Sequence, residues 1–176
     1  IETIEHDAAL GGMILKMVNS SRYGLAKTVE SIEQASVLLG LAVLKNEVFG
    51  VMLLKAFDTE SDPFNDLMWH IGSVCSQAAQ TLAKASAQNI SPDLAYLVGL
   101  LQDTGCLTLA TIDDTSYPKI QRACYAKPIQ ALQKEQERYG TTHTAISYLF
   151  AKYWKIPDDV CIAIYHSHSI NSSEIP

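Results

Sequence analysis

Four side chains of the kinds that bind divalent metals are spread along the chain: His70, Asp103, His143 and His166. The helical periodicity described below places each of them on a separate helix, beside apolar positions. Imidazole nitrogens and a carboxylate oxygen that converge from several helices are suitable ligands for a divalent metal in a helical bundle. A histidine on an apolar helix face is nevertheless more often a hydrogen-bonded core residue than a ligand. A metal site is therefore predicted only if the four helices converge.

The other polar residues near these positions are weaker candidates. His168 lies two residues after His166, about 200° further round a helix, so the two side chains cannot face one site. We expect His166 to face it and His168 to be a poor fifth member. The remaining charged candidates are expected to lie on solvated surface, namely His6, Glu135, Glu137 and Arg138.

No sequence motif identifies a nucleophile or a phosphate-binding loop. Ser20 or Cys106 would need a partnered base, and no spacing indicates one. Asp103 precedes Thr104-Gly105 and can also be explained as a residue that ends its helix. The four cysteines form no Cys-x-x-Cys pair, which argues against a zinc knuckle or a disulfide scaffold and favours reduced, buried thiols. They are Cys75, Cys106, Cys124 and Cys161.

Composition narrows the class of protein. The 176 residues are 48% hydrophobic and 18% charged, which indicates a folded globular chain. With 13 basic and 19 acidic residues the formal net charge is -6, and no dense Lys/Arg run occurs, so nucleic-acid binding is disfavoured. No uninterrupted apolar run reaches the roughly 18 residues of a membrane span, and no signal peptide is evident. A cytoplasmic location is expected, and the abrupt start suggests a fragment of a longer protein.

Apolar spacing predicts helices almost throughout. Asp7 can cap a helix through Leu10, Ile14 and Val18, and Ser31 can cap a second helix that ends at Gly40. Further predicted helices run from Leu44 to about Phe57, from Asp62-Pro63, from Ser91-Pro92, through residues 145–153 and from Pro157. The helix after Pro63 is expected to be the longest, with one buried face formed by Leu67, Ile71, Val74, Cys75, Ala78 and Leu82.

The predicted fold class is all-α, because no hairpin turn or long alternating run competes with the helical pattern. The turn-prone stretch 58–63 is the best internal boundary. It separates a predicted N-terminal helical lobe, residues 1–57, from a larger lobe, residues 63–176. Because the connection is short, the first lobe is expected to pack against the second.

Short motifs along the chain resemble those of one protein family. The segments Asp7–Leu10 and Asn19–Gly24 resemble the opening signature of the HDOD family, with an acid, a leucine, and then Asn-Ser-x-x-aromatic-Gly. The segment Val29–Ala35, followed by Leu38–Gly40, is similar to its second signature.

The second half of the chain continues the resemblance in the same order. Trp69-His70 is similar to the helix that carries the family's first histidine. Leu100–Gly105 reads Leu-Leu-Gln-Asp-Thr-Gly where HD phosphohydrolases have Leu-Leu-His-Asp-x-Gly. The pattern is completed by Tyr139–His143, Trp154–Pro157 and Ala163–His166.

The resemblance implies an HD-domain-like helical bundle, with an N-terminal lobe packed on an HD-like lobe, of the kind found in bacterial signalling proteins. In the wider superfamily the His and His-Asp residues bind a metal that hydrolyses phosphoesters. Here Gln102 replaces the histidine of that pair, Ser167 replaces one of two adjacent histidines, and no final aspartate ligand is evident. A glutamine amide is a much weaker ligand than imidazole. His70, Gln102, Asp103, His143 and His166 are therefore predicted to be a vestigial metal site, with no catalytic residue and no cofactor expected.

Two functions remain open at this stage. The first is a non-catalytic regulatory module that binds a partner signalling protein or a small ligand. The alternative is a metal-dependent phosphohydrolase, acting on a phosphoester or nucleotide, that uses His70, Asp103, His143 and His166 without Gln102.

Overall fold

The structure is a computed structural model that describes residues 8–19, 25, 27–56, 63–124 and 126–169. Within these ranges the regular structure is helical and includes no strand, which confirms the predicted all-α class. The chain divides into two compact units, residues 1–59 and 60–176. Asp7 and residues 58–62, where a cap and a boundary were predicted, lie outside the described residues. The packing of the first lobe on the second stays a prediction.

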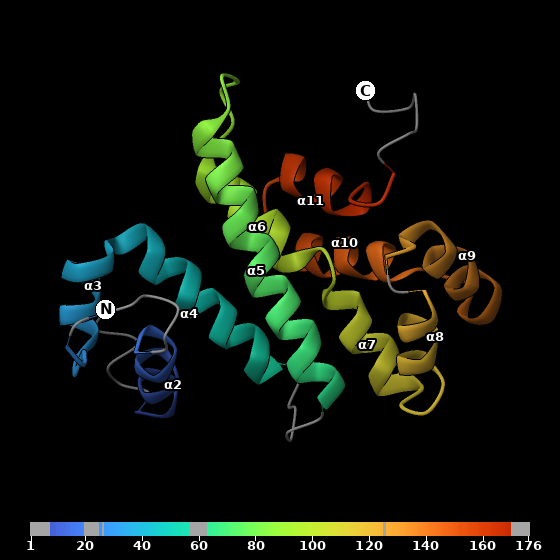
Figure 1. Ribbon diagram of the computed structural model, residues 1–176, viewed down its shortest axis with the longest axis horizontal. Coiled ribbons are helices and arrows are strands. Elements are labelled where there is room, and N and C mark those ends of the chain that lie inside the picture. The colour runs from blue at the N-terminus through green and yellow to red at the C-terminus, as the bar shows by residue number, and fades with distance from the viewer. Residues whose placement is uncertain (1–7, 20–24, 26, 57–62, 125, 170–176) are drawn as a thin grey trace. The chain divides into compact units, whose positions relative to one another are not determined.

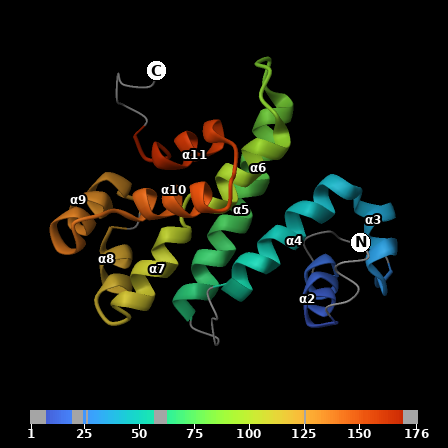
Figure 2. The same cartoon turned by 180° about the vertical axis from the view of Figure 1, so that it is seen from behind.

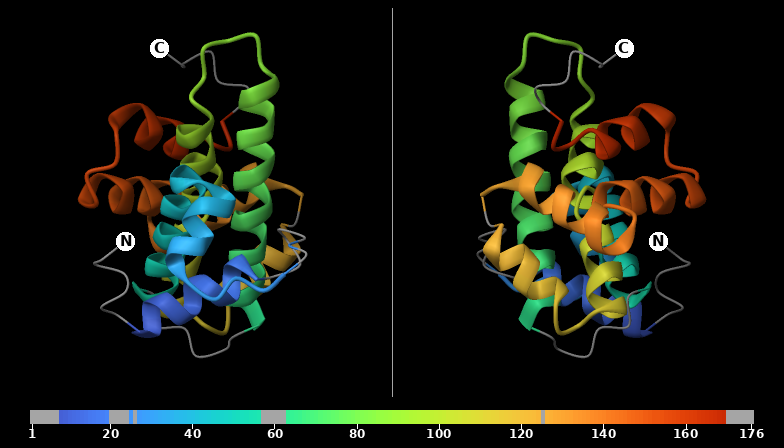
Figure 3. Two further views of the ribbon diagram at one scale, coloured as in Figure 1. Left: turned by 90° about the vertical axis from the view of Figure 1, so that its left-hand side faces the viewer. Right: turned by 90° about the vertical axis from the view of Figure 1, so that its right-hand side faces the viewer.

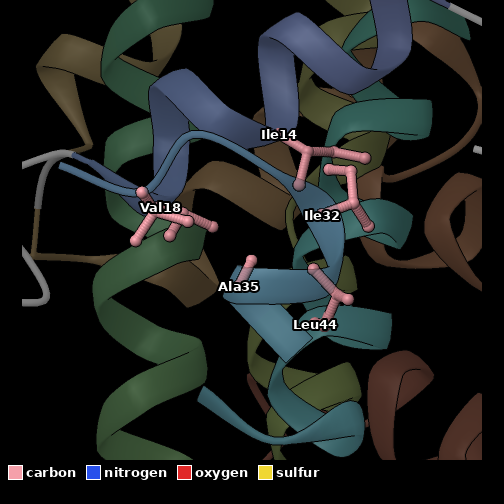
Figure 4. Close-up of a cluster of buried hydrophobic side chains, with 6 residues drawn as sticks. Ile14, Val18, Ile32, Ala35 and Leu44 are labelled. Atoms are coloured by element: carbon pink, nitrogen blue, oxygen red, sulfur yellow. The ribbon is translucent and has the colours of Figure 1, made fainter. Parts of the chain in front are cut away.

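The described part of the first unit contains the helices α2 (Ala8–Val18), α3 (Ile32–Leu39) and α4 (Leu41–Ala56). Ile14 and Val18, one helical turn apart on α2, are fully buried, as their spacing predicts. Their side chains meet those of α3 and α4 in a small core (Figure 4), whose buried members are Ile14, Val18, Val29, Ile32, Ala35 and Leu44.

The ends of α3 are capped as its sequence predicts. Ser31 Oγ accepts a hydrogen bond from the backbone N–H of Gln34 at 3.0 Å. At the other end Gly40 has a φ of 82°, a left-handed value that favours glycine. The approach to the helix is fixed by Asn19, whose amide group bonds both the N–H and the C=O of Val29, at 2.7 and 2.8 Å. Local polar contacts therefore define this helix as much as its apolar face does.

The second unit holds the other described helices, α5 to α11 (Figures 1 and 2), and its range, residues 60–176, includes every residue of the predicted site. The long α5 and the shorter α6 lie side by side and are joined at one end of the unit (Figure 3). Helix α7 packs against α10, and α10 packs against α11. The helices are α5 (Pro63–Ala85), α6 (Pro92–Leu101), α7 (Thr104–Ile112), α8 (Tyr117–Ala123), α9 (Pro128–Tyr139), α10 (His143–Tyr153) and α11 (Asp158–Tyr165).

Helix α5 is the longest of these, as predicted, but the predicted buried face is wrong. Leu67, Val74 and Leu82 are 47%, 51% and 71% exposed. The buried residues are instead Phe64, Gly72, Ser76 and Ala83, most of them small. A Cβ atom on Gly99 of α6 would lie only 2.6 Å from the carbonyl oxygen of Cys75. The two helices therefore pack almost backbone to backbone, and this close contact selects small residues over large apolar ones.

Residues Pro92–Ile112, which comprise α6 and α7, have the length and hydropathy of a membrane span. The most apolar window of this stretch is 56% buried inside the unit, as in the core helix of a folded domain. Gln102 and Asp103 interrupt the apolar run at the junction between the two helices. The stretch therefore forms part of the hydrophobic core, and the polar residues that interrupt it belong to the candidate site.

Candidate functional site

The junction between α6 and α7 positions Asp103. This residue stands at the N-cap of α7, but its carboxylate makes no capping hydrogen bond. Oδ2 instead lies 3.4 Å from the side-chain nitrogen of Gln102, and Oδ1 lies 3.6 Å from Nε2 of both His143 and His168. Asp103 therefore lies between the end of α6 and the start of α7. Its carboxylate is directed at the imidazoles of His143 and His168.

The backbone around His143 is held against α7 at very close range. A Cβ atom on Gly105 would lie 2.1 Å from the carbonyl oxygen of His143. Beside this contact, Ser147 Oγ accepts a hydrogen bond from the N–H of Gly105 at 2.8 Å and donates one to the carbonyl of Gln102 at 2.9 Å. Thr142 caps α10 through its side chain. These contacts fix the first turn of α10, and with it the position of His143.

Glu135 on α9 is the centre of a buried hydrogen-bond network. It is fully buried, which overturns the expectation that it lies on a solvated face with Glu137 and Arg138. Its carboxylate accepts hydrogen bonds from the phenol of Tyr117, the amide of Gln121 and the backbone N–H of His143, at 2.8 to 2.9 Å. It also contacts Nδ1 of His143 at 2.8 Å. Burial raises the pKa of Tyr117 far above its ordinary value, so this phenol is a permanent donor.

The Glu135 contact determines the chemistry of His143. A carboxylate at Nδ1 favours the tautomer in which Nδ1 carries the proton and Nε2 keeps its lone pair. That Nε2 atom is buried and has no hydrogen-bond partner. Asp103 Oδ1 lies 3.6 Å from it, and the Cys106 sulfur lies within 4.8 Å of a ring nitrogen of His143. The site therefore offers an unpaired imidazole lone pair beside a carboxylate and a thiol.

A pocket of about 160 Å³ opens above these groups. One wall is apolar and comes from α5, through Phe64, Leu67, Met68 and Ile71. The opposite wall comes from the end of α8 and the start of α9. The side chains with polar or thiol groups that line the pocket are Asp103, Cys106, Gln121, Arg122, Cys124, His143 and His168. A cavity with apolar walls and a few converging polar groups is the usual form of a small-molecule site.

The predicted site residues divide into two groups. Gln102, Asp103 and His143 come together. His166 does not join them, because it lines a separate surface hollow with Tyr148, Ile162 and Tyr165. The imidazole that reaches Asp103 belongs to His168, whose ring lies 5.1 Å from that of His143. His166 and His168 do point to different places, but α11 ends at Tyr165, and in the turn that follows it is His168 that reaches Asp103.

His70 is exposed on α5 and does not line the pocket, so its expected inner-face position is wrong. Its neighbours Leu67 and Val74 are also largely exposed, because the helix buries its small-residue face instead. We therefore expect His70→Ala to change the free energy of unfolding by less than about 0.5 kcal/mol. Urea denaturation followed by circular dichroism would measure this change. A loss above about 1 kcal/mol would show that His70 makes buried contacts.

Arg138 behaves as the sequence suggests and forms a surface ion pair. Its guanidinium donates to Asp113 Oδ2 at 2.8 and 3.0 Å, and Tyr139 and the backbone N–H of Ser116 donate to the same carboxylate. The Arg138 hydrogen bonds, followed by that from Ser116, lower the pKa of Asp113 to about 2. A carboxyl pKa that is depressed in the folded protein stabilises it above the ordinary value, and this contribution is lost as the pH falls from about 4 to about 2.

The titration of Asp113 tests this contact. In Arg138→Ala we expect the pKa of Asp113 to rise toward the ordinary range of about 3.9. NMR titration of the side-chain carboxyl carbons would measure it in both proteins. Lys134→Ala, which removes an exposed charge from the same helix, is the matched control and should leave the Asp113 pKa unchanged. Equal Asp113 pKa values with and without Arg138 would contradict the ion pair.

The metal set of a phosphohydrolase does not fit this chain. Gln102 presents an amide where the hydrolases have an imidazole, and His70 and His166 lie away from Asp103 and His143. Hydrolysis at a metal needs several ligands and an open coordination position for water. His70, Gln102 and His166 therefore do not complete such a ligand set around Asp103 and His143.

The described helices of the second unit place the aspartate of the Leu-Leu-Gln-Asp-Thr-Gly segment at the junction between α6 and α7. The sequence matches the family model described as HDOD domain over residues 1–170. The chain belongs to the HDOD domain family.

Known proteins with similar chains are bacterial and longer. An uncharacterized protein of Treponema pallidum (strain Nichols) is 25% identical over 170 residues, which are 97% of this chain and 33% of that protein. The crystal structure of an HDOD domain protein of unknown function from Geobacter sulfurreducens is similar over 98% of this chain and 58% of its own, with 22% identity and a TM-score of 0.77. The crystal structure of a candidate signal transduction protein from Marinobacter aquaeolei VT8 has 26% identity and a TM-score of 0.76, over 98% of this chain and 40% of its own.

Proposed function

We propose that this domain is a non-catalytic regulatory module of signal transduction, in the cytoplasm, whose pocket in the second unit binds a small ligand. The observation that carries the proposal is the arrangement of the residues at the predicted vestigial metal site. Its hydrolase ligands are dispersed or replaced, while a pocket with a buried polar floor remains beside Asp103 and His143. The signal transduction protein from Marinobacter supports the functional class. Binding of a partner signalling protein stays a prediction.

The pocket has properties that suit ligand sensing. Its polar groups come from α7, α8, α10 and the turn after α11, so a ligand that contacts them would bridge several helices. A ligand shifts the equilibrium between conformations by its difference in affinity for them. Because His143 is tied to Glu135 and through it to Tyr117 and Gln121, movement at the pocket floor would reach the contact between α8 and α9.

Absence of phosphoester turnover tests the non-catalytic part of this proposal. We expect the full chain to hydrolyse neither p-nitrophenyl phosphate nor bis-p-nitrophenyl phosphate above background, with manganese, magnesium, iron or zinc added. Asp103→Asn removes the charge at the site with little change of shape and is the matched control. Metal-dependent turnover that disappears in Asp103→Asn would overturn the proposal and favour the phosphohydrolase.

A further inference from the structure

A sulfur, an oxygen and a nitrogen meet at the floor of the pocket. Ligand atoms of Asp103, Cys106 and His143 lie within 4.8 Å of one another. Asp103 and Cys106 are three residues apart, which places them on one face of the first turn of α7. The imidazole of His168 approaches the same carboxylate. We propose that these four side chains form a binding site for a divalent transition-metal ion of the zinc type.

His143 is already arranged as a metal ligand. Its Nδ1 contacts the buried Glu135 carboxylate, and its Nε2 is buried without a partner. Metal-bound histidines usually donate their second ring N–H to a carboxylate or a carbonyl, which fixes the tautomer and makes the free nitrogen more basic. A buried polar atom without a partner is destabilising unless something fills the space beside it. A cation in contact with Nε2 would satisfy this atom.

The distances at the site suit a tetrahedral ion better than hydrogen bonds. Asp103 Oδ1 lies 3.6 Å from Nε2 of both His143 and His168, which is too long for a hydrogen bond. Two oxygen or nitrogen ligands placed about 2.0–2.1 Å from a zinc ion at the tetrahedral angle stand about 3.4 Å apart, and a thiolate stands about 3.6 Å from its neighbours. Asp103 and His143 would move by a few tenths of an ångström and Cys106 Sγ by about 1 Å, while His168, which lies outside this group of three, would turn further to reach the ion.

The charges at the site also balance. One carboxylate and one thiolate neutralise a divalent ion, and two neutral imidazoles complete the shell. Without an ion, burial and then the charge of Asp103 raise the pKa of Cys106 well above its ordinary value, so the thiol keeps its proton. Binding of the ion would release that proton to solvent, with no other change in bonding. The mixed sulfur, nitrogen and oxygen donors favour zinc or cobalt over magnesium or calcium.

Four protein ligands would leave no coordination position for water, so the ion would be structural or regulatory and not hydrolytic. The inference therefore rests on the proposed function and deepens it, because it names the class of ligand at the pocket floor. It also departs from the sequence-based expectation that no metal is bound. That expectation rested on His70, Gln102, Asp103, His143 and His166; it treated His168 as a poor fifth member and did not count Cys106 as a ligand.

Cobalt titration of the full 176-residue chain, metal-free and reduced, tests the site. We expect a near-ultraviolet band from sulfur-to-cobalt charge transfer, together with the intense visible bands of tetrahedral cobalt. Added zinc should abolish both. Cys106→Ser should lose the charge-transfer band, while Cys161→Ser, which alters a buried thiol on α11, should retain it.

The two nearby histidines give a second matched pair that does not disturb the helical core. His168→Ala should weaken cobalt binding at least about 10-fold, whereas His166→Ala should leave it unchanged. Absence of a charge-transfer band in the parent, or its persistence in Cys106→Ser, would overturn the metal site. That result would leave the regulatory proposal intact, since the regulatory proposal depends on the hydrolysis assay. Turnover by the metal-loaded protein would instead overturn the regulatory proposal and leave the site standing.

Discussion

Glu135→Ala is expected to destabilise the second unit by about 3–5 kcal/mol, or to prevent it from folding. The carboxylate accepts hydrogen bonds from Tyr117, Gln121 and His143, of which Tyr117 and His143 are buried and Gln121 is partly buried. Each buried polar group that loses its partner costs about 1–3 kcal/mol. The cavity left by the side chain adds to that loss. Urea denaturation, followed by near-ultraviolet circular dichroism of the buried tyrosine, would measure the change.

The same helix supplies the control for this variant. Glu137 lies two residues further on and is exposed, so Glu137→Ala should change the free energy of unfolding by no more than about 0.5 kcal/mol. Glu135→Gln separates charge from shape, because it keeps the size of the side chain but places an NH₂ group among donors. Equal stabilities of the Glu135 and Glu137 alanine variants would mean that the network does not hold α8, α9 and α10 together.

Gly105→Ala is expected to have an effect of similar size, at least about 3 kcal/mol, through a steric clash. The added methyl group would meet the backbone carbonyl of His143 at 2.1 Å, and a main chain held by Ser147 cannot move aside as the tip of a long side chain would. A structure of the variant, if it folds, should show α7 and α10 further apart. Thermal and urea unfolding would give the loss of stability.

Alanine substitutions at other glycines extend Gly105→Ala to a series in which the contact distance of the added methyl group varies. Gly72→Ala would bring its methyl group 3.2 Å from the carbonyl oxygen of Leu100, so its cost should be smaller than that at Gly105. A Cβ atom on Gly12 in α2 would have nothing within 4 Å of it. Gly12→Ala should therefore stabilise the helix by about 0.5–1 kcal/mol. Losses of stability that do not follow this order of contact distance would contradict the close packing.

The helices could be predicted from the sequence because their ends carry local signals. Ser31 and Gly40 bound α3, and Ser91 with Pro92 starts α6, each by contacts within a few residues. The buried face of α5 could not be obtained in the same way. Apolar spacing marked Leu67, Val74 and Leu82, but the contact with α6 is so close that glycine, serine and alanine form it. Which of two faces a helix buries depends on its neighbour.

The candidate site was predicted only in part, for a related reason. Asp103 and His143 were found by residue type and by the family resemblance, and they do lie together. Glu135 was assigned to solvent because charged residues usually are, although it shares a face with Ala131 and Tyr139 at four-residue spacing, and that pattern was a usable signal. His168 had no such signal. Its direction depends on where α11 stops, and a single turn decides between His168 and His166.

The order in which the helices are synthesised leaves the apolar stretch Pro92–Ile112 incompletely covered for a time. Much of its cover comes from α10 and α11, which follow it in the chain. At a ribosomal rate of about 5–20 residues per second, that cover is completed only about 3–10 s after α7 has been made. During this interval α6 and α7 can pack on α5, but they lack α10 and α11. A chain arrested before His143 would therefore be a substrate for chaperones or for aggregation, while α2 to α4 could already be packed.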